Sequence, residues 1–497
     1  MLLLGFRLSV IITALLGLIA GRADAPRVTV DTGTLEGLDT AGVMVFRGIP
    51  YAAPPVGELR WRPPQPAAHW SGVRDASKLG HNCVQHQPYS DIDPFAAGVS
   101  EDCLYLNVWT PPPASRLPPP ASRLPPPASR LPLPVLIWIH GGGFWAGFGG
   151  EERHNGAPLA KKGAVVVTLN YRLGPFGFLA HPALASESPH HAAGNYGLLD
   201  QIAALQWVQR NIARFGGDPS RVTIFGESAG GMSVGSLIAS PLAKGLFQRA
   251  ILESGPGVGG TGVSPRDTVR AIAFRFAEAL GVYGAGADAA RHLRALSPDT
   301  LLATSLHIGP PGAPRFFPAV DGWVLPHPVD SAIALGAANI VPVIAGSNRD
   351  EGDEWMAAPS RAFARLTSAR GVPTYMYIFS RVGDDSVNRK RGAYHSAEIT
   401  FVFGRPHPIL ASAGTSSYDS TVAEAMSDYW VAFATSGDPN GQPTAGKWPR
   451  WPRYNASTDA LLEIGPQIAP RTMVKRAVYD SLDAVARSHG GLRPGPN

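Results

Sequence analysis

The stretch Val222-Thr-Ile-Phe-Gly-Glu-Ser-Ala-Gly230 decides the fold of this chain. Its first four residues, Val222 to Phe225, form a short apolar run that is typical of a buried strand. The run leads directly into a G-x-S-x-G pattern, whose small residues let the backbone turn sharply into a helix without side-chain collision. A strand, a tight turn and a helix would lift Ser228 out of a sheet, and Ser228 is therefore the candidate nucleophile.

A second segment fits the same pattern. Gly231-Met-Ser-Val-Gly235 follows at once, and in a chain of 497 residues with 56 glycines a bare match has little weight. Ser233 falls inside the helix that we expect after the turn, so we predict that it is a packing residue.

Further strand candidates are continuously apolar rather than alternating, which favours a parallel sheet covered on both faces. They are Val135–Ile139, Ala164–Leu169, Val222–Phe225 and Pro342–Ala345, and Leu198–Ala213 between the second and third has apolar residues at helical spacing. Strand–helix–strand order predicts an α/β fold, with a mostly parallel, doubly wound central sheet flanked by helices on both faces. We see no linker, so residues 26–497 are expected to form a single domain.

The composition excludes several classes of protein. With 44% hydrophobic and 16% charged residues, the chain can bury a large core and is not disordered. The net charge of +5 comes from scattered basic residues, so nucleic acid is not an expected partner. Two cysteines exclude a cysteine-based zinc or iron–sulfur cluster, and we expect neither a metal nor another cofactor.

The N-terminus has the layout of a secretory signal peptide. Arg7 precedes the apolar run Leu8–Ala20, and small residues follow up to Ala25. We predict that residues 1–25 are removed, that no membrane-spanning segment remains, and that the protein is secreted or periplasmic. In an exported protein, Cys83 and Cys103 are the only pair available for an intrachain disulfide.

Residues 111–131 are a proline-rich repeat that reads PPPASRL three times. Three prolines in each unit exclude a helix, and we expect an extended surface loop that the fold tolerates.

A glycine triplet follows the first strand candidate. In His140-Gly-Gly-Gly-Phe144, residues without side chains let backbone N–H groups point into a pocket and meet a developing negative charge. Together with the serine turn downstream, this favours an oxyanion hole.

These motifs resemble those of the type-B carboxylesterase family, the carboxylesterase and cholinesterase group of the α/β-hydrolase fold. Phe215–Gly231 resembles the serine signature of the family, Glu101–Trp109 its second signature and Phe46–Trp61 its N-terminal block. The likeness extends from about residue 26 to beyond residue 460. It implies an α/β-hydrolase fold, a small-molecule ester as substrate, and hydrolysis without a cofactor.

The resemblance also implies the other members of a catalytic triad. Gly346–Gly352 matches the family's G-x-N-x-D-E-G stretch and gives Glu351 as the acid, although the spacing alone leaves Asp350 and Asp353 open. The family's histidine precedes an E-I-x-[FY]-V-F-G run, which here gives His395. Ser228 would attack the ester carbonyl, His395 would accept its proton, and Glu351 would orient the imidazole.

The remaining assignments implied by the resemblance surround this triad. The backbone N–H groups of Gly142, Gly143 and Ala229 would bind the oxyanion, and Ser254 is either a partner of the triad or an ordinary serine at a strand end. The implied structural pairs are the disulfide Cys83–Cys103 and the ion pairs Arg60–Glu101 and Arg172–Asp200.

Two departures from the family pattern bear on specificity. Cholinesterases carry a tryptophan in the disulfide loop, whereas Tyr89 and Phe95 are the only aromatic residues between the cysteines here, so we expect a general carboxylesterase. Glu351 and His395 are only 44 residues apart. The chain between them is shorter than the resemblance implies, and residues 356–360 alone join the two matched pieces of sequence there.

The shortening predicts a more open acyl pocket. It also leaves open a catalytically impaired binding protein, and an amidase or carbamate hydrolase of the same fold is open because acyl-serine chemistry does not depend on the leaving group.

Overall fold

The computed structural model of the chain describes residues 25–86, 97–112, 131–259, 262–308, 316–384, 386–405, 417–473 and 475–488. The predicted signal peptide, all but its last residue, and most of the PPPASRL repeat lie outside these ranges. Within them, no helix combines the length and the apolar character needed to cross a membrane.

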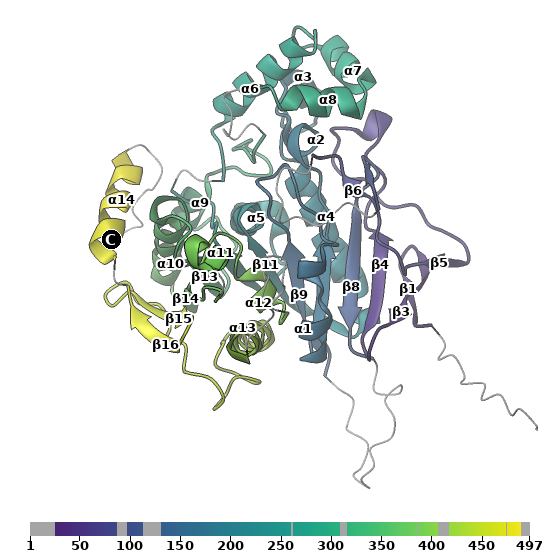
Figure 1. Cartoon of the computed structure of the whole chain (residues 1–497). Coiled ribbons are helices and arrows are strands. Elements are labelled where there is room, and N and C mark those ends of the chain that lie inside the picture. Colours follow the sequence, from purple (N-terminus) through teal and green to yellow (C-terminus); the bar gives the residue numbers. More distant parts are fainter. Residues whose placement is uncertain are drawn as a thin grey trace, which may run out of the picture.

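A large central sheet runs through the protein in the strand order β16-β15-β14-β13-β12-β11-β9-β10-β8-β4-β3 (Figure 1). All neighbouring strands from β10 to β15 in this order are parallel, and the pairs at the two edges are antiparallel. The strands are β3 Leu38–Asp39, β4 Met44–Pro50, β8 Tyr105–Thr110, β9 Leu133–Ile139, β10 Val165–Leu169, β11 Gly217–Glu227, β12 Arg249–Glu253, β13 Val343–Asn348, β14 Thr374–Phe379, β15 Ala460–Ile464 and β16 Ile468–Thr472. The small sheets comprise β1 Arg27–Val30, β2 Gly33–Glu36 and β5 Val73–Asp75, and β6 Asn82–Cys83 with β7 Val99–Ser100.

Helices cover both faces of this sheet, which explains the continuous hydrophobicity of the strands. Along β9, Val135, Ile137 and Ile139 enter the core on the side of α4 and α5, and Leu136 and Trp138 enter the core on the side of α13. The helices are α1 Ala157–Lys161, α2 Gly174–Phe178, α3 Pro182–Ser186, α4 Tyr196–Asn211, α5 Ala229–Ala239, α6 Arg266–Ala279, α7 Ala287–Ala295, α8 Pro298–Ser305, α9 Val329–Leu335, α10 Ala358–Ala369, α11 Ser386–Arg391, α12 Ile399–Val402, α13 Ser417–Ser436 and α14 Arg476–Ser488. The predicted α/β-hydrolase architecture is confirmed.

The winding of the sheet reverses at β9. From β9 the chain goes to β10 on one side, and it then returns past β9 to β11 on the other side. Parallel α/β sheets bind ligands at such a switch point, beyond the carboxyl ends of the strands. The glycine triplet follows β9 and Ser228 follows β11, so the fold places the two motifs next to each other.

The predicted elements are present, and the largest difference is at Val222–Phe225, which belongs to the longer strand β11, Gly217–Glu227. The predicted helix at Leu198–Ala213 is α4, which ends at Asn211 and continues as a 3-10 turn, Ile212–Phe215. Ser233 lies inside α5, is fully buried, and accepts a hydrogen bond from Gln201, as expected for a packing residue.

The segment after β13 is compact. After β13, Gly352 leads into a π-helical turn, Asp353–Ala357, which continues directly into α10. The C-terminal helix α14 packs on α10 at the periphery of the molecule (Figure 1).

Candidate active site

Ser228 occupies a strained turn between β11 and α5. Its backbone has φ 56° and ψ −121°, outside the usual regions for a residue with a side chain. The neighbouring glycines are required by close packing against β9: a Cβ on Gly226 would lie 2.6 Å from the carbonyl oxygen of Ile139, and one on Gly230 would overlap the same oxygen. The turn therefore exists because these two positions carry no side chain.

The glycine triplet after β9 packs directly against this turn. A Cβ on Gly141 would lie 3.3 Å from the Cβ of Ser228. Gly142 has φ 101°, and a Cβ there would overlap the carbonyl oxygen of Ala146. Within the described part of the chain, the N–H groups of Gly142 and Gly143 donate no hydrogen bond, and Ala229 is the first residue of α5, where N–H groups lack helical partners. These donors are available to a negatively charged oxygen.

His140 fixes the glycine triplet through hydrogen bonds of its ring and of its carbonyl group. Its Nδ1 is 2.8 Å from the carbonyl oxygen of Gly141, and its ring stacks on Tyr171 at 4.4 Å between centroids. The hydroxyl of Tyr171 donates to the carbonyl oxygen of His140. Burial lowers the pKa of His140 to about 4, so the ring is neutral at pH 7 and its Nδ1–H holds the Gly141 carbonyl in place.

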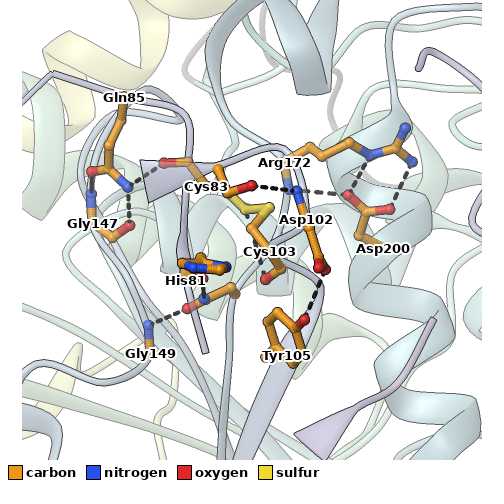
Figure 2. The surroundings of a disulfide bond; sticks show 12 residues. His81, Cys83, Gln85, Asp102, Cys103, Tyr105, Gly147, Gly149, Arg172 and Asp200 are labelled. Atoms are coloured by element: carbon orange, nitrogen blue, oxygen red, sulfur yellow. Dashed lines mark hydrogen bonds and ion pairs between the residues drawn. A yellow bond between two sulfur atoms is a disulfide. The ribbon is translucent and has the colours of Figure 1, made fainter. Parts of the chain in front are cut away.

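The predicted disulfide Cys83–Cys103 is present and is tied to the same loop (Figure 2). Gln85, two residues after Cys83, accepts from the N–H of Gly147 at 2.7 Å and donates to the carbonyl of Gly147 at 2.9 Å. The disulfide loop thus fixes the segment that follows the glycine triplet. The predicted ion pairs Arg60–Glu101 and Arg172–Asp200 are also formed.

Glu351 and His395 meet across two loops. The Nδ1 of His395 is 2.6 Å from Oε2 of Glu351, whose side chain is fully buried. The other oxygen of Glu351 accepts from the N–H of Asn348 at 2.6 Å. This carboxylate therefore fixes the orientation of the ring and, when the ring is neutral, favours the tautomer with its proton on Nδ1.

The two rival carboxylates face elsewhere. Asp350 pairs with Arg349 and accepts from the N–H of Ala393. Asp353 pairs with Lys475 and accepts from the hydroxyl of Tyr479. The alternatives left open by the spacing are thus decided by the direction of each side chain.

The other ring nitrogen of His395 faces a carboxylate that the sequence analysis did not assign. Its Nε2 is 3.2 Å from Oε1 of Glu227, the residue before Ser228, and in the described residues Ser228 makes no hydrogen bond to His395. Desolvation favours the neutral ring, but the charge of Glu227, the hydrogen bond and charge of Glu351, and the charge of Glu398 outweigh it and raise the pKa of His395 to about 10. The ring is an imidazolium at pH 7.

Two further carboxyl groups in this region, those of Glu398 and Glu253, are fully buried. Glu398 accepts hydrogen bonds from Nδ2 of Asn348 and, at 3.3 Å, from the hydroxyl of Ser254. Glu253 accepts from the indole N–H of Trp430 at 2.8 Å. Burial and the neighbouring negative charges raise the pKa of both carboxyl groups. Ser254 therefore contacts Glu398 rather than a member of the predicted triad.

Glu227 and Glu398 are the residues that sequence reasoning missed. Both stood inside the matched motifs, as the variable position of G-x-S-x-G and as the glutamate three residues after His395. Acidic residues at these two positions, next to a predicted nucleophile and a predicted base, were the available signal.

The motifs and geometry agree with the comparisons with known proteins. The model of the carboxylesterase family matches residues 24–358 and 352–481. The chain belongs to the carboxylesterase family. It is 37% identical to fumonisin B1 esterase of Sphingopyxis macrogoltabida over 500 residues, covering 88% of this chain and 86% of that protein. It is 34% identical to para-nitrobenzyl esterase of Bacillus subtilis over 498 residues, covering 89% and 95%.

A comparison with solved structures indicates the same family. A PNB esterase structure superposes with a TM-score of 0.79 at 32% identity, covering 92% of this chain and 99% of that one. As a carboxylesterase, the protein is a carboxylic ester hydrolase that acts on small-molecule esters. The two parts of the family match overlap at residues 352–358, which partly coincide with residues 356–360, where the chain is shorter than the family resemblance implies.

Proposed function

We propose that this protein is a serine carboxylesterase that works through an acyl-serine intermediate. Ser228 attacks the ester carbonyl, and His395 accepts the proton of Ser228 and delivers it to the leaving alcohol. Water then attacks the acyl group, with His395 again acting as the base. Glu351 orients His395 and stabilises its positive charge, and the N–H groups of Gly142, Gly143 and Ala229 bind the oxyanion.

The observation that carries this proposal is the position of His395. One ring nitrogen is held by Glu351, and the other lies 3.2 Å from the residue next to Ser228. Hydrogen bonds of a catalytic site are often long before the substrate binds, and they tighten in the substrate complex. We expect a rotation of the imidazole or of the serine side chain to bring Nε2 from Glu227 to the serine hydroxyl in the substrate complex.

The negative charge of Glu227 hinders one step of this mechanism and assists another. An imidazolium cannot accept a proton, so His395 must lose one before Ser228 can attack. Once the acyl transfer is under way, the same carboxylate stabilises the imidazolium that forms. We therefore expect the rate to rise with pH through the alkaline range.

The shortened segment bears on the acyl group. The side chain of His395 is 39% exposed and that of Trp355, four residues after Glu351, is 66% exposed. An open site of this kind accommodates bulky acyl groups. We propose that kcat/KM for a p-nitrophenyl ester falls little, if at all, when acetate is replaced by benzoate.

The predicted export of the protein remains part of the proposal. Disulfides form and persist outside the cytosol, and Cys83–Cys103 supports a secreted or periplasmic protein. N-terminal sequencing of the protein from the culture medium or periplasm tests this: a mature chain that begins near Ala25 supports export, and an intact Met1 in the cytosol contradicts it.

Hydrolysis of p-nitrophenyl acetate tests the proposed chemistry. We expect turnover by the wild type, its loss in Ser228→Ala, and its retention in Ser233→Ala, the matched control from the second G-x-S-x-G pattern. Activity retained in Ser228→Ala would contradict the proposal. The matching acetanilide separates esterase from amidase, because an amidase would cleave both compounds at comparable rates.

A further inference from the structure

The position of Glu351 depends on the short segment that follows it. Gly352, with φ 109°, is the single residue between the carboxylate residue and the turn that follows it, in a conformation that favours glycine. The π-helical turn Asp353–Ala357 then runs straight into α10. Because only one residue separates Glu351 from this turn, we expect a displacement of the turn to shift Glu351 unless another part of the chain holds the turn in place.

The C-terminal end of the protein supplies that support. The hydroxyl of Tyr479 in α14 donates to Oδ1 of Asp353 at 2.8 Å. The ammonium of Lys475, which directly precedes α14, is 2.8 Å from Oδ2 of the same carboxylate. Tyr479 is buried, whereas Lys475 is half exposed. Both oxygens of Asp353, two residues after Glu351, are therefore held by residues more than a hundred positions away.

Helix α14 is anchored to α10 by buried ion pairs, which allows it to hold the turn Asp353–Ala357 in place. Arg361 of α10 is fully buried, and its guanidinium contacts Asp459 at 2.9 Å together with Asp480 and Asp483 of α14. A buried charge network of this kind fixes geometry because leaving any member unpaired is costly. Around it, the side chains of Tyr479 and Leu482 pack into an apolar cluster with Ala357 and Ala358.

We propose that Lys475 and Tyr479 are positioning residues for the reaction, which act through Asp353 to hold Glu351 against His395. The inference rests on the proposed function, because it assigns these residues to the acid of the proposed triad. They touch neither the substrate nor the reacting atoms. Through these contacts, α14 holds the segment after Glu351 in place, and this segment is shorter than the family resemblance implies.

The kinetic consequence differs from that of a merely structural contact. A looser Glu351 weakens the 2.6 Å contact to His395 and leaves substrate binding unchanged. We expect kcat to fall about tenfold with KM within about twofold, since small misplacements at a reacting centre cost rate. The groups that face His395 are Glu227, Glu351 and Glu398. When Glu351 moves away, the pKa of His395 decreases and the acid limb of the kcat/KM profile shifts to lower pH.

The experiment uses the full chain and p-nitrophenyl acetate. The double variant Lys475→Met/Tyr479→Phe removes both contacts to Asp353 and keeps the apolar body of each side chain. Arg471→Met is the matched control: it removes one exposed charge from β16, and Arg471 pairs with Glu463 at 3.1 Å rather than with Asp353 or the Arg361 network. Lys475→Arg keeps the ion pair and should retain the wild-type rate.

The results separate the two proposals. The inference predicts a lower kcat and a shifted acid limb in the double variant, and wild-type values in Arg471→Met and Lys475→Arg. A double variant with unchanged kcat and unchanged pH profile overturns it, whatever happens to the melting temperature. Should the double variant fail to fold, Tyr479→Phe alone is the test, and an unchanged pH profile again overturns the inference. Failure of the proposed function has a different signature, which is no turnover by the wild type or full turnover by Ser228→Ala.

Discussion

Substituting Glu227 by Gln tests the electrostatics of the site most sharply. The change keeps the shape of the side chain and removes the negative charge 3.2 Å from Nε2 of His395. Coulomb's law puts the attraction between unit charges at this distance at about 1.3 kcal/mol in water and about 5 kcal/mol at an effective dielectric constant of about 20. Because 39% of the imidazole side chain is exposed, solvent screens the pair, and we take a value near the lower limit.

The expected result is a lower pKa of His395 by about 1–2 units, since one unit corresponds to about 1.4 kcal/mol. The wild-type pKa is raised to about 10, so the neutral, active imidazole is the minor form until the pH reaches that value. Removing the charge makes the neutral form available at lower pH. The acid limb of kcat/KM must therefore move down by about the same 1–2 units.

The assay is the pH profile of kcat/KM for p-nitrophenyl acetate, corrected for spontaneous hydrolysis. Glu227→Asp keeps the charge and should leave the limb alkaline, and Glu278→Gln removes the charge of an exposed glutamate on α6 as a control. An acid limb that stays in place or moves to higher pH in a folded Glu227→Gln variant would refute the electrostatic argument.

Three other substitutions test the supports of the site. Gly142→Ala places a Cβ against the carbonyl of the loop at a φ of 101°, and we expect kcat to fall about 10²–10³-fold with a small change in KM; an unchanged kcat would remove Gly142 from the oxyanion hole. Replacing both Cys83 and Cys103 by Ser opens a loop of 20 residues, so the free energy of unfolding measured in urea should fall by about 3 kcal/mol, and a reductant should have no further effect on this variant. Arg361→Met removes the fully buried cation that pairs with Asp459 and Asp483 and should lower the free energy of unfolding by up to about 3–5 kcal/mol, since Asp459 keeps its contact to Arg476, whereas a loss below about 1 kcal/mol would show that the network is not a firm anchor.

The parts of the site that could be predicted from the sequence are those written into one local stretch of chain. The turn at Ser228 needs residues without side chains at Gly226 and Gly230 because both press against the carbonyl of Ile139. This requirement is visible in the sequence as two glycines, and the strand before the turn and the helix after it support the interpretation. The disulfide was predictable for the simpler reason that the chain has two cysteines.

Other features depend on where distant segments come together. Asp350, Glu351 and Asp353 are similar in type and adjacent in sequence, and only the path of the loop decides that Glu351 meets His395. The contact between Asp353 and Tyr479 joins residues 126 positions apart, and no local pattern predicts it. The approach of Glu227 to His395 is likewise set by packing between β11 and the loop before α12.

The central claim is that Ser228 carries the acyl group, and trapping this intermediate tests it directly. The wild type is quenched with acid during turnover of p-nitrophenyl acetate and digested with trypsin. Cleavage after Arg221 and Lys244 yields the peptide that contains both Ser228 and Ser233, which fragmentation in the mass spectrometer distinguishes. The account predicts an acetyl group on Ser228. An acetyl group on Ser233 or on another residue, or turnover with no acylated peptide, would contradict it.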